Sequence, residues 1–339
     1  MPEKNVPSEM SAIHHPLTIE LEGKRHVIVA ITDYDGTAVN ELLPEDQRLS
    51  TIGPAREATE ILERNRILVG VGTSRSSGEA LSAQEALHGH GITFAENGAT
   101  AILPKEELTE STKQKLAGEF GDNLTMLQER YVVRLSDLSL ERIDEFLKTC
   151  SLEAAAQDPT GNQEMVSTRF SSPARLQEVA RHATITAARL SAERIASAYI
   201  AEPNPVQRET IMRLASEWGI YAHGHHINLI GKDANKGKAM RFINDHARYF
   251  IPQAGDIAGI IPIFFGNGEN DIELFQEAET MGGYGVIVGH PDGGFGVSED
   301  KIPASTIRQP QSHEFGGIKA SLPALFNRIN NRYGTALKV

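Results

Sequence analysis

The sequence predicts an α/β protein: a doubly wound, Rossmann-like parallel sheet with a second, α+β domain inserted into the chain. Two observations predict this class. Apolar runs such as 27–31 and 259–265 show no polar alternation, as expected for strands buried on both faces of a sheet. Segments with helical spacing of apolar residues separate such runs, which is the strand-helix-strand order of parallel sheets. After Pro104 this order gives way to charged helical segments, which indicates the inserted domain.

Composition and charge exclude several other classes. The 339 residues suggest about two domains at roughly 150 residues each, and 40% hydrophobic with 23% charged residues is ordinary for a soluble protein. No apolar run reaches the roughly 18 to 20 residues of a membrane span. The net charge of -12 argues against a nucleic-acid or anionic-membrane surface. An anionic substrate would therefore need a local basic site.

The first 24 residues are polar and lack the basic and apolar regions of a signal peptide. We expect them to form a polar extension outside the core, and we expect a cytoplasmic location. The single cysteine, Cys150, excludes an intrachain disulfide and a cysteine-rich zinc site. The oligomeric state cannot be predicted from these features.

The first predicted strand, 27–32, leads into Asp33, and Asp35, Gly36 and Thr37 follow in a turn. Two carboxylates so close repel each other unless a cation or a shared proton intervenes. Mg²⁺ suits carboxylate and carbonyl oxygens and is commonly completed by a substrate phosphate. With the charge neutralised, one Asp could attack phosphorus and the other could act as general acid and base. The alternative is an Asp-rich turn that carries no chemistry.

A helix separates this motif from a second buried strand, 67–73, which ends in Thr73, Ser74 and Arg75. A hydroxyl between a strand and a helix N-terminus is well placed to hold a phosphoryl oxygen. A hydroxyl residue in this position is, however, more often a helix cap. Arg75 would bind the substrate or pair with Glu79.

A third strand begins at Ile92 and ends in a tight turn at Asn97 and Gly98. The inserted domain is expected over 104–232, where charged helical stretches are mixed with short strand candidates. Within it, Arg169 would contact a substrate carboxylate or hydroxyl, or else form a surface salt bridge.

A strand predicted over 221–230 carries His223, His225 and His226. A metal site is disfavoured there, because residues 223 and 225 share one strand face, residue 226 points to the other, and no carboxylate lies at useful spacing. Contact of one of these histidines with the substrate cleft stays open.

The core is expected to resume at 233 with a loop that opens a helix at Asn235 and Lys236. Such a loop can aim a lysine and backbone amides at a phosphate. Lys232 and Lys238 are expected to be solvated.

The fourth strand, 259–265, ends in a second acidic, glycine-bearing turn over 266–271. A fifth strand, 284–289, leads to His290 and Asp292, which border the site or only shape a loop. The C-terminal segment then predicts a closing amphipathic helix.

Four of these segments, in order and each after an apolar strand, resemble the motifs of the haloacid dehalogenase (HAD) superfamily. The matching segments are Asp33-Tyr34-Asp35-Gly36-Thr37, Thr73, Lys236-Gly237-Lys238-Ala239 and residues 266–271. The resemblance implies that Asp33 is the nucleophile and Asp35 the general acid and base. It implies that Thr73 and Lys236 hold the phosphoryl oxygens.

The resemblance also implies a HAD core over 25–103 and 233–339, with a C2-type cap over 104–232 that closes over the site and selects the substrate. Residues 1–24 would lie outside both domains.

Mg²⁺ is the cofactor that the resemblance implies, held by Asp33, the main-chain carbonyl of Asp35, Asn267 and Asp271, directly or through water. Asn267 stands where the superfamily has a metal-binding Asp. Its amide oxygen can ligate Mg²⁺ without supplying charge. The affinity would then be weaker, or Asp271 and Glu269 would carry more of the site.

Within the superfamily, residues 96–99, the helix start at Lys236 and the run 286–293 resemble the Cof-type and mannosyl-3-phosphoglycerate phosphatase branch. This implies a Mg²⁺-dependent phosphomonoester hydrolase acting on a phosphorylated sugar or glycosyl-3-phosphoglycerate. The residues implied at the substrate are Gly36, Thr37, Ser74, Arg75, Asn97, Arg169 and Asn270.

Two other functions stay open. A phosphotransferase or phosphomutase would use the same aspartyl-phosphate and pass the phosphoryl group to a sugar. A catalytically weak binding or regulatory protein is suggested by Asn267 in place of a charged metal ligand.

Overall fold

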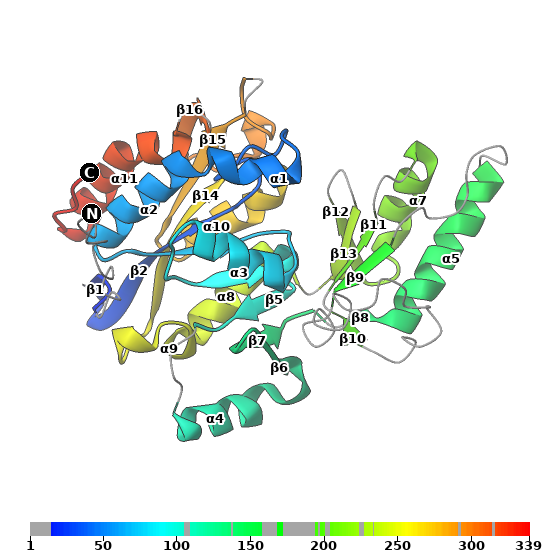
Figure 1. Cartoon of the computed structure of the whole chain (residues 1–339), viewed down its shortest axis with the longest axis horizontal. Helices are drawn as coiled ribbons and strands as arrows, with labels where there is room; N and C mark the ends of the chain where they lie inside the picture. The colour runs from blue at the N-terminus through cyan, green and yellow to red at the C-terminus, as the bar shows by residue number, and fades with distance from the viewer. Residues whose placement is uncertain are drawn as a thin grey trace, which may run out of the picture.

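The computed structural model, drawn in Figure 1, describes most of the chain. The described residues are 15–104, 109–136, 138–157, 168–171, 194–195, 197–200, 204–223, 227–232, 234–290, 293–313 and 316–339. Within them the chain forms a ten-stranded, a four-stranded and a two-stranded sheet. The ten-stranded sheet is the core, and the two smaller sheets belong to a second unit.

Parallel strands form the larger part of this sheet, from one edge inward, as the uninterrupted apolar runs predict. In spatial order they are β16 (Ile307–Ser312), β15 (Tyr284–Gly289), β14 (Gly259–Gly266), β2 (Lys24–Thr32), β3 (Leu68–Gly72) and β4 (Thr93–Ala95). Each neighbouring pair along this order runs parallel. The chain builds from β2 toward β4 and later returns to build the other side from β14, so the doubly wound class is confirmed.

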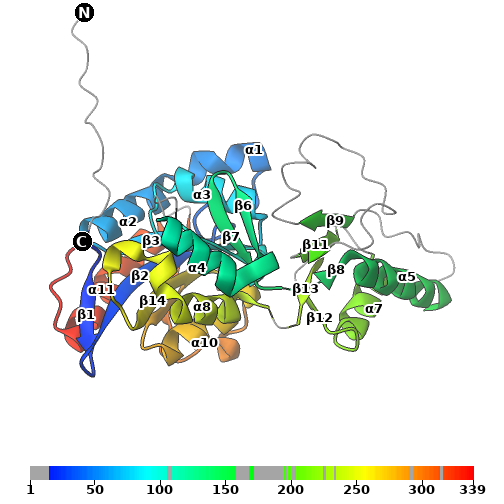
Figure 2. The same cartoon turned by 90° about the horizontal axis from the view of Figure 1, so that it is seen from below.

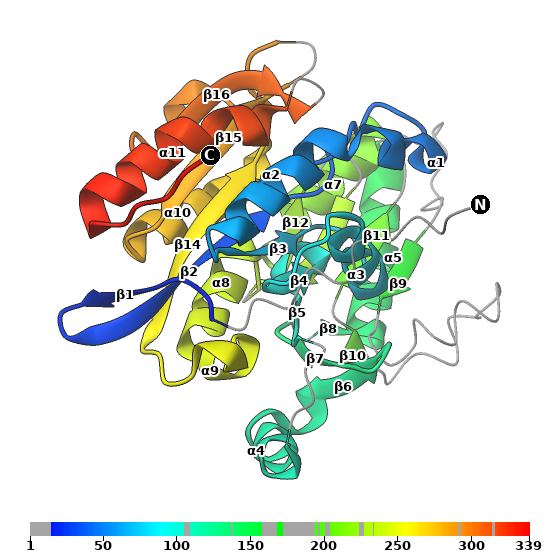
Figure 3. The ribbon, with the colours of Figure 1, turned by 60° about the vertical axis from the view of Figure 1, so that its left-hand side comes forward.

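Helices cover both faces of this sheet (Figure 3). Alternate residues of β2 face opposite sides: Ile28 and Ala30 belong to one apolar cluster, and Val29 and Ile31 to the other. The first cluster includes residues of α2 (Gly53–Arg64) and α11 (Gly317–Tyr333). The second includes residues of α8 (Lys236–Asp245), α9 (Ala247–Phe250) and α10 (Ile272–Thr280). A strand covered on both faces needs apolar residues at every position, which explains the apolar run.

Residues 1–24 were expected to lie outside the core, but the last residues of this segment belong to the core sheet. β1 (Thr18–Leu21) pairs antiparallel with β2, and Ile19 is buried in the core. Glu22 and Gly23 join the two strands, and both have positive φ, at 52° and 73°. Two successive residues with positive φ match the twist of a tight β-hairpin.

The core sheet also extends past the boundary expected at 104. Three antiparallel strands continue it beyond β4, in the order β5 (Thr100–Ile102), β7 (Arg130–Arg134) and β6 (Leu124–Leu127). Leu116 of α4 (Glu110–Phe120) and Val133 of β7 are buried in the core cluster. The inserted unit is therefore narrower than expected and begins at about Leu138.

The inserted unit has its own sheets (Figures 1 and 2). It also has its own apolar core. Its four-stranded antiparallel sheet has the order β12 (Ile220–His223), β13 (Ile227–Gly231), β11 (Ser197–Ile200) and β9 (Thr168–Ser171). The other elements are β8 (Leu138–Ser139), α5 (Leu140–Gln157), β10 (Arg194–Ile195) and α7 (Pro205–Ala215). Phe146, Ile211 and Leu229 bring both helices and the sheet into one cluster. This is the α+β organisation that the sequence predicts.

The strand expected over 221–230 is in fact two strands, β12 and β13, which pair antiparallel. His223 ends β12. His225 and His226 lie outside the described residues, and so does Asp292. The predictions made for these three residues are therefore not addressed by the structure.

Candidate active site

The carboxyl edge of the central strands gathers polar side chains around one cavity. β2 leads into Asp33, whose main-chain N–H donates to the carbonyl of Phe265 on β14 (2.8 Å). The direction of winding reverses between these two strands, which is where open α/β sheets bind their ligands. The cavity measures about 270 Å³ and is lined by Asp33, Asp35, Glu41, Ser74, Asn267, Gly268, Asn270, His290 and Gly296.

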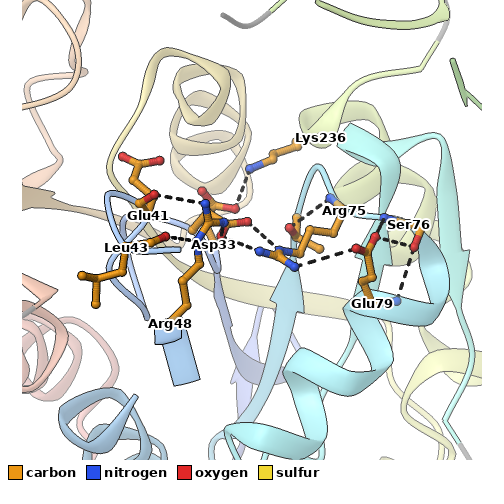
Figure 4. A network of polar contacts seen from close by, with 10 residues as sticks. Asp33, Glu41, Leu43, Arg48, Arg75, Ser76, Glu79 and Lys236 are labelled. Atoms are coloured by element: carbon orange, nitrogen blue, oxygen red, sulfur yellow. Dashed lines mark hydrogen bonds and ion pairs between the residues drawn. The ribbon is translucent and has the colours of Figure 1, made fainter. Parts of the chain in front are cut away.

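Lys236 joins two buried acids beside this cavity. It begins α8, whose N-terminus is capped by Asn235, the side chain of which accepts from the N–H of Lys238 (2.7 Å). The ammonium group of Lys236 donates to Asp33 Oδ1 (3.1 Å) and to Asp271 Oδ1 (2.7 Å). Figure 4 shows the lysine pointing at Asp33. Since Lys236 is only 1% exposed, both contacts lie in a medium that strengthens them.

Burial dominates the electrostatics of this group. It raises the pKa of Asp33 to about 8; Lys236 opposes the rise, and Asp271 and Asp35 add to it. Burial also disfavours the charge of Lys236, but the two carboxylates outweigh it and raise the pKa of the lysine. Lys236 is therefore a permanent cation that two acids share.

Asp271 anchors the loop after β14. Its Oδ2 accepts from the main-chain N–H groups of Asn267 (3.0 Å) and Gly268 (3.1 Å), while Oδ1 accepts from Lys236. A Cβ at Gly266 would lie 2.5 Å from Asp271 Oδ2, which explains the glycine at this position. Both oxygens of the carboxylate are thus engaged, so a metal could take one only by displacing such a bond.

Two arginines hold Asp35. Arg75 donates from Nε to Asp35 Oδ2 (2.7 Å) and from Nη2 to Oδ1 (2.9 Å), and Arg48 donates from Nη1 to Oδ1 (2.8 Å). Arg75 lies farther from Glu79, at 3.8 Å, so its main partner is Asp35. Arg48 ends α1 (Glu45–Arg48) and approaches from another side (Figure 4). No local sequence feature pointed to Arg48, which lies 13 residues from Asp35.

The turn after β4 is fixed against the end of β3. Thr73 is fully buried, and its hydroxyl accepts from the N–H of Arg75 (3.2 Å). Its carbonyl accepts from the N–H of Asn97 (3.1 Å). Ser74, and not Thr73, lines the cavity. Thr73 therefore has the geometry of a cap for the following turn and lies one residue behind the cavity wall.

Asn97 is held in an unusual conformation. Its φ is 56°, that of Glu96 is 55°, and that of Gly98 is 89°. A Cβ at Gly98 would lie 2.2 Å from the carbonyl oxygen of Asn235, so the turn is pressed against the start of α8. The side-chain amide of Asn97 is buried, and neither its nitrogen nor its oxygen has a hydrogen-bond partner in the described part of the chain. Such strained, unsatisfied groups are typical of ligand sites.

Asn267 lies between Thr37 and Glu41. The hydroxyl of Thr37 donates to Asn267 Oδ1 (3.1 Å), and Asn267 Nδ2 lies 3.4 Å from Glu41 Oε1. Gly36 has φ 73°, and a Cβ there would lie 2.0 Å from Asn267 Nδ2 and 2.7 Å from Glu41 Oε1. Glycine is therefore required both for the turn and for the close approach of these two side chains.

Glu41 is a site residue that the sequence did not reveal. Its Oε1 also lies 3.9 Å from Nε2 of His290, a residue that the sequence placed near the site edge. Burial raises the pKa of Glu41, and the charge of Asp35 adds to this. Glu41 lies eight positions after Asp33 in the chain, and no strand or motif marks it.

The donors around the cavity fit a hydrated, hard cation. The described residues contain no group of three or more His, Cys, Asp or Glu side chains arranged to hold a metal. The cavity is bordered instead by the carboxylates of Asp33 and Glu41 and the amide of Asn267. Mg²⁺ accepts such oxygen donors and usually keeps several waters, so it needs few protein ligands.

The other candidates fall into three groups. Asn270, which was expected to contact the substrate, lines the cavity. Lys232 and Lys238 are exposed, and Glu269 pairs with a lysine away from the cavity (2.7 Å). Arg169 lies on β9 of the inserted unit, and its side chain is outside the described part of the structure.

A family profile described as haloacid dehalogenase-like hydrolase matches residues 30–292, which is well over half of the chain. The chain belongs to this family of hydrolases. The matched residues run from the middle of β2, past Asp33, Thr73, Lys236 and Asn267, to the loop after β15. A search of curated proteins found no match to the HAD chain.

Solved structures share the HAD fold over nearly their whole length. A HAD subclass IIB sugar phosphatase is 16% identical, with a TM-score of 0.55, covering 88% of this chain and 98% of that one. BT1666 from Bacteroides thetaiotaomicron, a phosphatase of the HAD superfamily, is 13% identical, with a TM-score of 0.53 and coverage of 89% and 96%. A HAD/COF-like hydrolase from Plasmodium vivax is 12% identical, with a TM-score of 0.54 and coverage of 91% and 98%. At these identities the likeness concerns the fold.

Across the described ranges of the HAD chain, none of the helices combines the length and the apolar composition needed to cross a bilayer.

Proposed function

We propose that this HAD hydrolase is a Mg²⁺-dependent phosphomonoesterase that works through an aspartyl-phosphate on Asp33. The observation that carries the proposal is the placement of this side chain. Asp33 borders the cavity, its Oδ1 is held by Lys236, and its Oδ2 has no hydrogen-bond partner among the described residues. A carboxylate held by one oxygen and open at the other is arranged as a nucleophile.

The proposed reaction has two displacements at phosphorus. Asp33 Oδ2 attacks, the bond between phosphorus and the ester oxygen breaks, and Asp35 gives that oxygen a proton. A water then attacks the phosphorus, Asp35 takes a proton from the water, and the bond to Asp33 breaks to release inorganic phosphate. Lys236 offsets negative charge beside the nucleophile during both displacements.

Asp35 can serve as acid and base only if it reaches the substrate, and in the structure both of its oxygens are bound to arginines. One of these contacts must open when the substrate enters. Arg75 presents a planar fork that suits a phosphoryl group as well as a carboxylate. We assign Arg75 to the phosphoryl oxygens after this exchange, together with Ser74 and the amide of Asn97, which has no partner among the residues that the structure describes.

Mg²⁺, when bound, would neutralise charge on the phosphoryl oxygens during transfer. The residues that would hold it are Asp33, Asn267 and the main-chain carbonyl of Asp35. Asp271 supports this set by fixing the loop that carries Asn267. The mixed donor chemistry at the cavity supports Mg²⁺ over a softer metal.

A phosphorylated sugar or glycosyl-3-phosphoglycerate is the proposed substrate class. The support is the resemblance of residues 96–99 and 286–293 to the Cof-type and mannosyl-3-phosphoglycerate phosphatases, together with the shared fold of a sugar phosphatase. The unit over 138–232 is proposed to act as a C2-type cap, and Arg169 on it to contact the non-phosphate part of the substrate. We also propose that the protein works in the cytoplasm.

Phosphate release from phosphorylated sugars, glycosyl phosphoglycerates and an aryl phosphate, with and without Mg²⁺, tests the proposal. We expect metal-dependent turnover that Asp33→Asn abolishes. Turnover that survives this substitution would contradict an aspartyl-phosphate. Transfer to a sugar acceptor without phosphate release would favour the phosphotransferase, and ligand binding with no turnover would favour the regulatory protein that Asn267 suggests.

A further inference from the structure

The acidic side chains of the site are not all matched by basic ones. Asp33 and Asp271 share Lys236, and two arginines take the carboxylate of Asp35. One carboxylate that borders the cavity is left, that of Glu41.

Glu41 has only weak partners. Its Oε1 lies 3.4 Å from the neutral amide of Asn267 and 3.9 Å from the imidazole of His290. Its side chain is 36% exposed and so partly withdrawn from water, and among the described residues its carboxylate has no ion pair closer than the one with His290. A carboxylate in this position lowers its free energy by acquiring a positive partner.

The backbone holds Glu41 in this place. Arg48 donates from Nη2 to the carbonyl of Glu41 (3.1 Å) and from Nε to the carbonyl of Leu43 (3.0 Å). The side chain of Asn40 accepts from the N–H of Leu42 (2.9 Å). The segment that presents Glu41 to the cavity is thus pinned on both sides of this residue.

Asn267 and Glu41 complement each other. The superfamily pattern has a charged Asp where this chain has the neutral Asn267, and the structure places a carboxylate beside that amide. Asp33 is a second, independent sign of a missing partner. It is 6% exposed and borders the same cavity, and its Oδ2 has no hydrogen-bond partner within the described ranges.

We propose that Glu41 supplies the negative charge that Asn267 lacks, so that Asp33, Asn267 and Glu41 together hold a divalent cation, with Glu41 acting directly or through water. This inference rests on the proposed function, because it concerns the cation of the same site. Glu41 would be a cation-binding residue that lies outside the four sequence motifs. A partly exposed carboxylate suits Mg²⁺, because the ion keeps several bound water molecules. These waters can donate hydrogen bonds to the carboxylate.

Binding of Mn²⁺ to the whole protein, followed by electron paramagnetic resonance without substrate and then displaced by Mg²⁺, tests this directly. Glu41→Gln is expected to weaken cation binding by about ten-fold or more. Glu269→Gln is the matched control: it is the same change near Asn267, at an exposed residue paired with Lys301 outside the cavity lining. We expect it to leave binding unchanged.

A compensating substitution at Asn267 provides a second test. Asn267→Asp should tighten Mn²⁺ binding in the wild-type background and should restore it in Glu41→Gln. Thermal unfolding without metal shows whether each variant is folded. The restored affinity separates a role in cation binding from a merely structural one.

Equal Mn²⁺ affinity of wild type and Glu41→Gln would overturn the inference, and so would a wild type that binds neither Mn²⁺ nor Mg²⁺. Failure of the compensating Asn267→Asp substitution would also overturn it. The outcomes for the Glu41 and Asn267 variants are independent of catalysis, since phosphate release that needs Asp33 can persist with or without a contribution from Glu41. A wild type that binds neither cation would contradict the Mg²⁺ dependence of the proposed function as well. Loss of the proposed function would instead show as absent turnover with intact cation binding.

Discussion

At the scale of single residues, the surroundings of Asp35 decide how the site can work. Arg75 binds both of its oxygens, and Arg48 adds a third hydrogen bond while also holding two carbonyls of the segment 41–43. Arg48 thus links the proposed acid and base to the loop that carries Glu41. The planar guanidinium group of Arg48 makes these three hydrogen bonds at once, in a geometry that a lysine could not reproduce. We consider Arg48 a positioning residue, because it acts through Asp35.

Removal of Arg48 should therefore lower turnover more than substrate binding. For Arg48→Ala we expect kcat to fall by roughly ten- to hundred-fold, less than the full contribution of a general acid and base, which is about 10² to 10⁴. Arg48→Lys, which keeps the charge and loses the fork, should lie between this variant and wild type. Steady-state kinetics on the best substrate measure kcat and KM separately.

Arg64→Ala, at an exposed arginine on α2, is the control and should match wild type. A folded Arg48→Ala protein with unchanged kcat would show that Arg75 alone positions Asp35.

At the scale of elements, a buried glutamate connects α2 to the approach to β4. Glu63 is 4% exposed and accepts from the N–H of His90 (2.9 Å) and from its ring Nδ1 (2.8 Å). It also lies 3.4 Å from the N–H of Val69 on β3. One carboxylate thus ties a helix, a strand and a loop of the core.

This contact makes stability depend on pH. The hydrogen bond to Glu63 raises the pKa of His90 against the opposing effect of burial, so the folded chain binds the proton more tightly than the unfolded one. The stabilisation is fully present below the unfolded pKa of about 6.5 and is lost as pH rises through the raised folded pKa. Since the His90 side chain is 45% exposed, we expect roughly 1 kcal/mol or less.

Urea unfolding of wild type and His90→Gln at about pH 6 and about pH 9 measures this difference in the free energy of unfolding. The difference should be larger at the lower pH. His88→Asn, at an exposed histidine two residues away, is the control. A difference that grows toward high pH would contradict the assigned direction.

At the scale of the whole molecule, the chain has two hydrophobic units with separate centres. Phe146 of α5 is fully buried in the inserted unit, where its ring centroid lies 5.7 Å from that of Trp218. The apolar clusters on the two faces of the core sheet share no residue with the cluster around Phe146. Damage to one unit should therefore remain largely within it.

Phe146→Ala should destabilise the inserted unit by about 3–5 kcal/mol, because it leaves a cavity in a small core. Hydrogen exchange by mass spectrometry should show lost protection over 205–231 and retained protection over 259–289. Leu152→Ala on the same helix is the control, since Leu152 is 74% exposed. Equal loss of protection in both regions would mean that the units unfold as one.

Much of the fold and of the site could be predicted from local sequence. The apolar run of β2 and the residues after it place Asp33 and Asp35 at a strand end, and Lys236 opens a helix as expected. These predictions succeed because carboxyl ends of adjacent parallel strands meet at one edge of a sheet. Local sequence leaves Thr73 with two roles, a phosphoryl contact or a cap. In the structure its hydroxyl accepts from the N–H of Arg75, and Ser74 lines the cavity.

Local sequence is enough to infer the α/β class, the membership of the HAD hydrolases and the order of the four motifs, because each of these is expressed in short contiguous segments. Three other features could be found only in the folded chain: Arg48 pairs with Asp35, Glu41 lies beside Asn267, and β6 and β7 extend the core sheet. These contacts join residues that are distant along the chain or lie in short irregular segments. Their partners are set by packing of the whole molecule, and packing leaves no local pattern in the sequence.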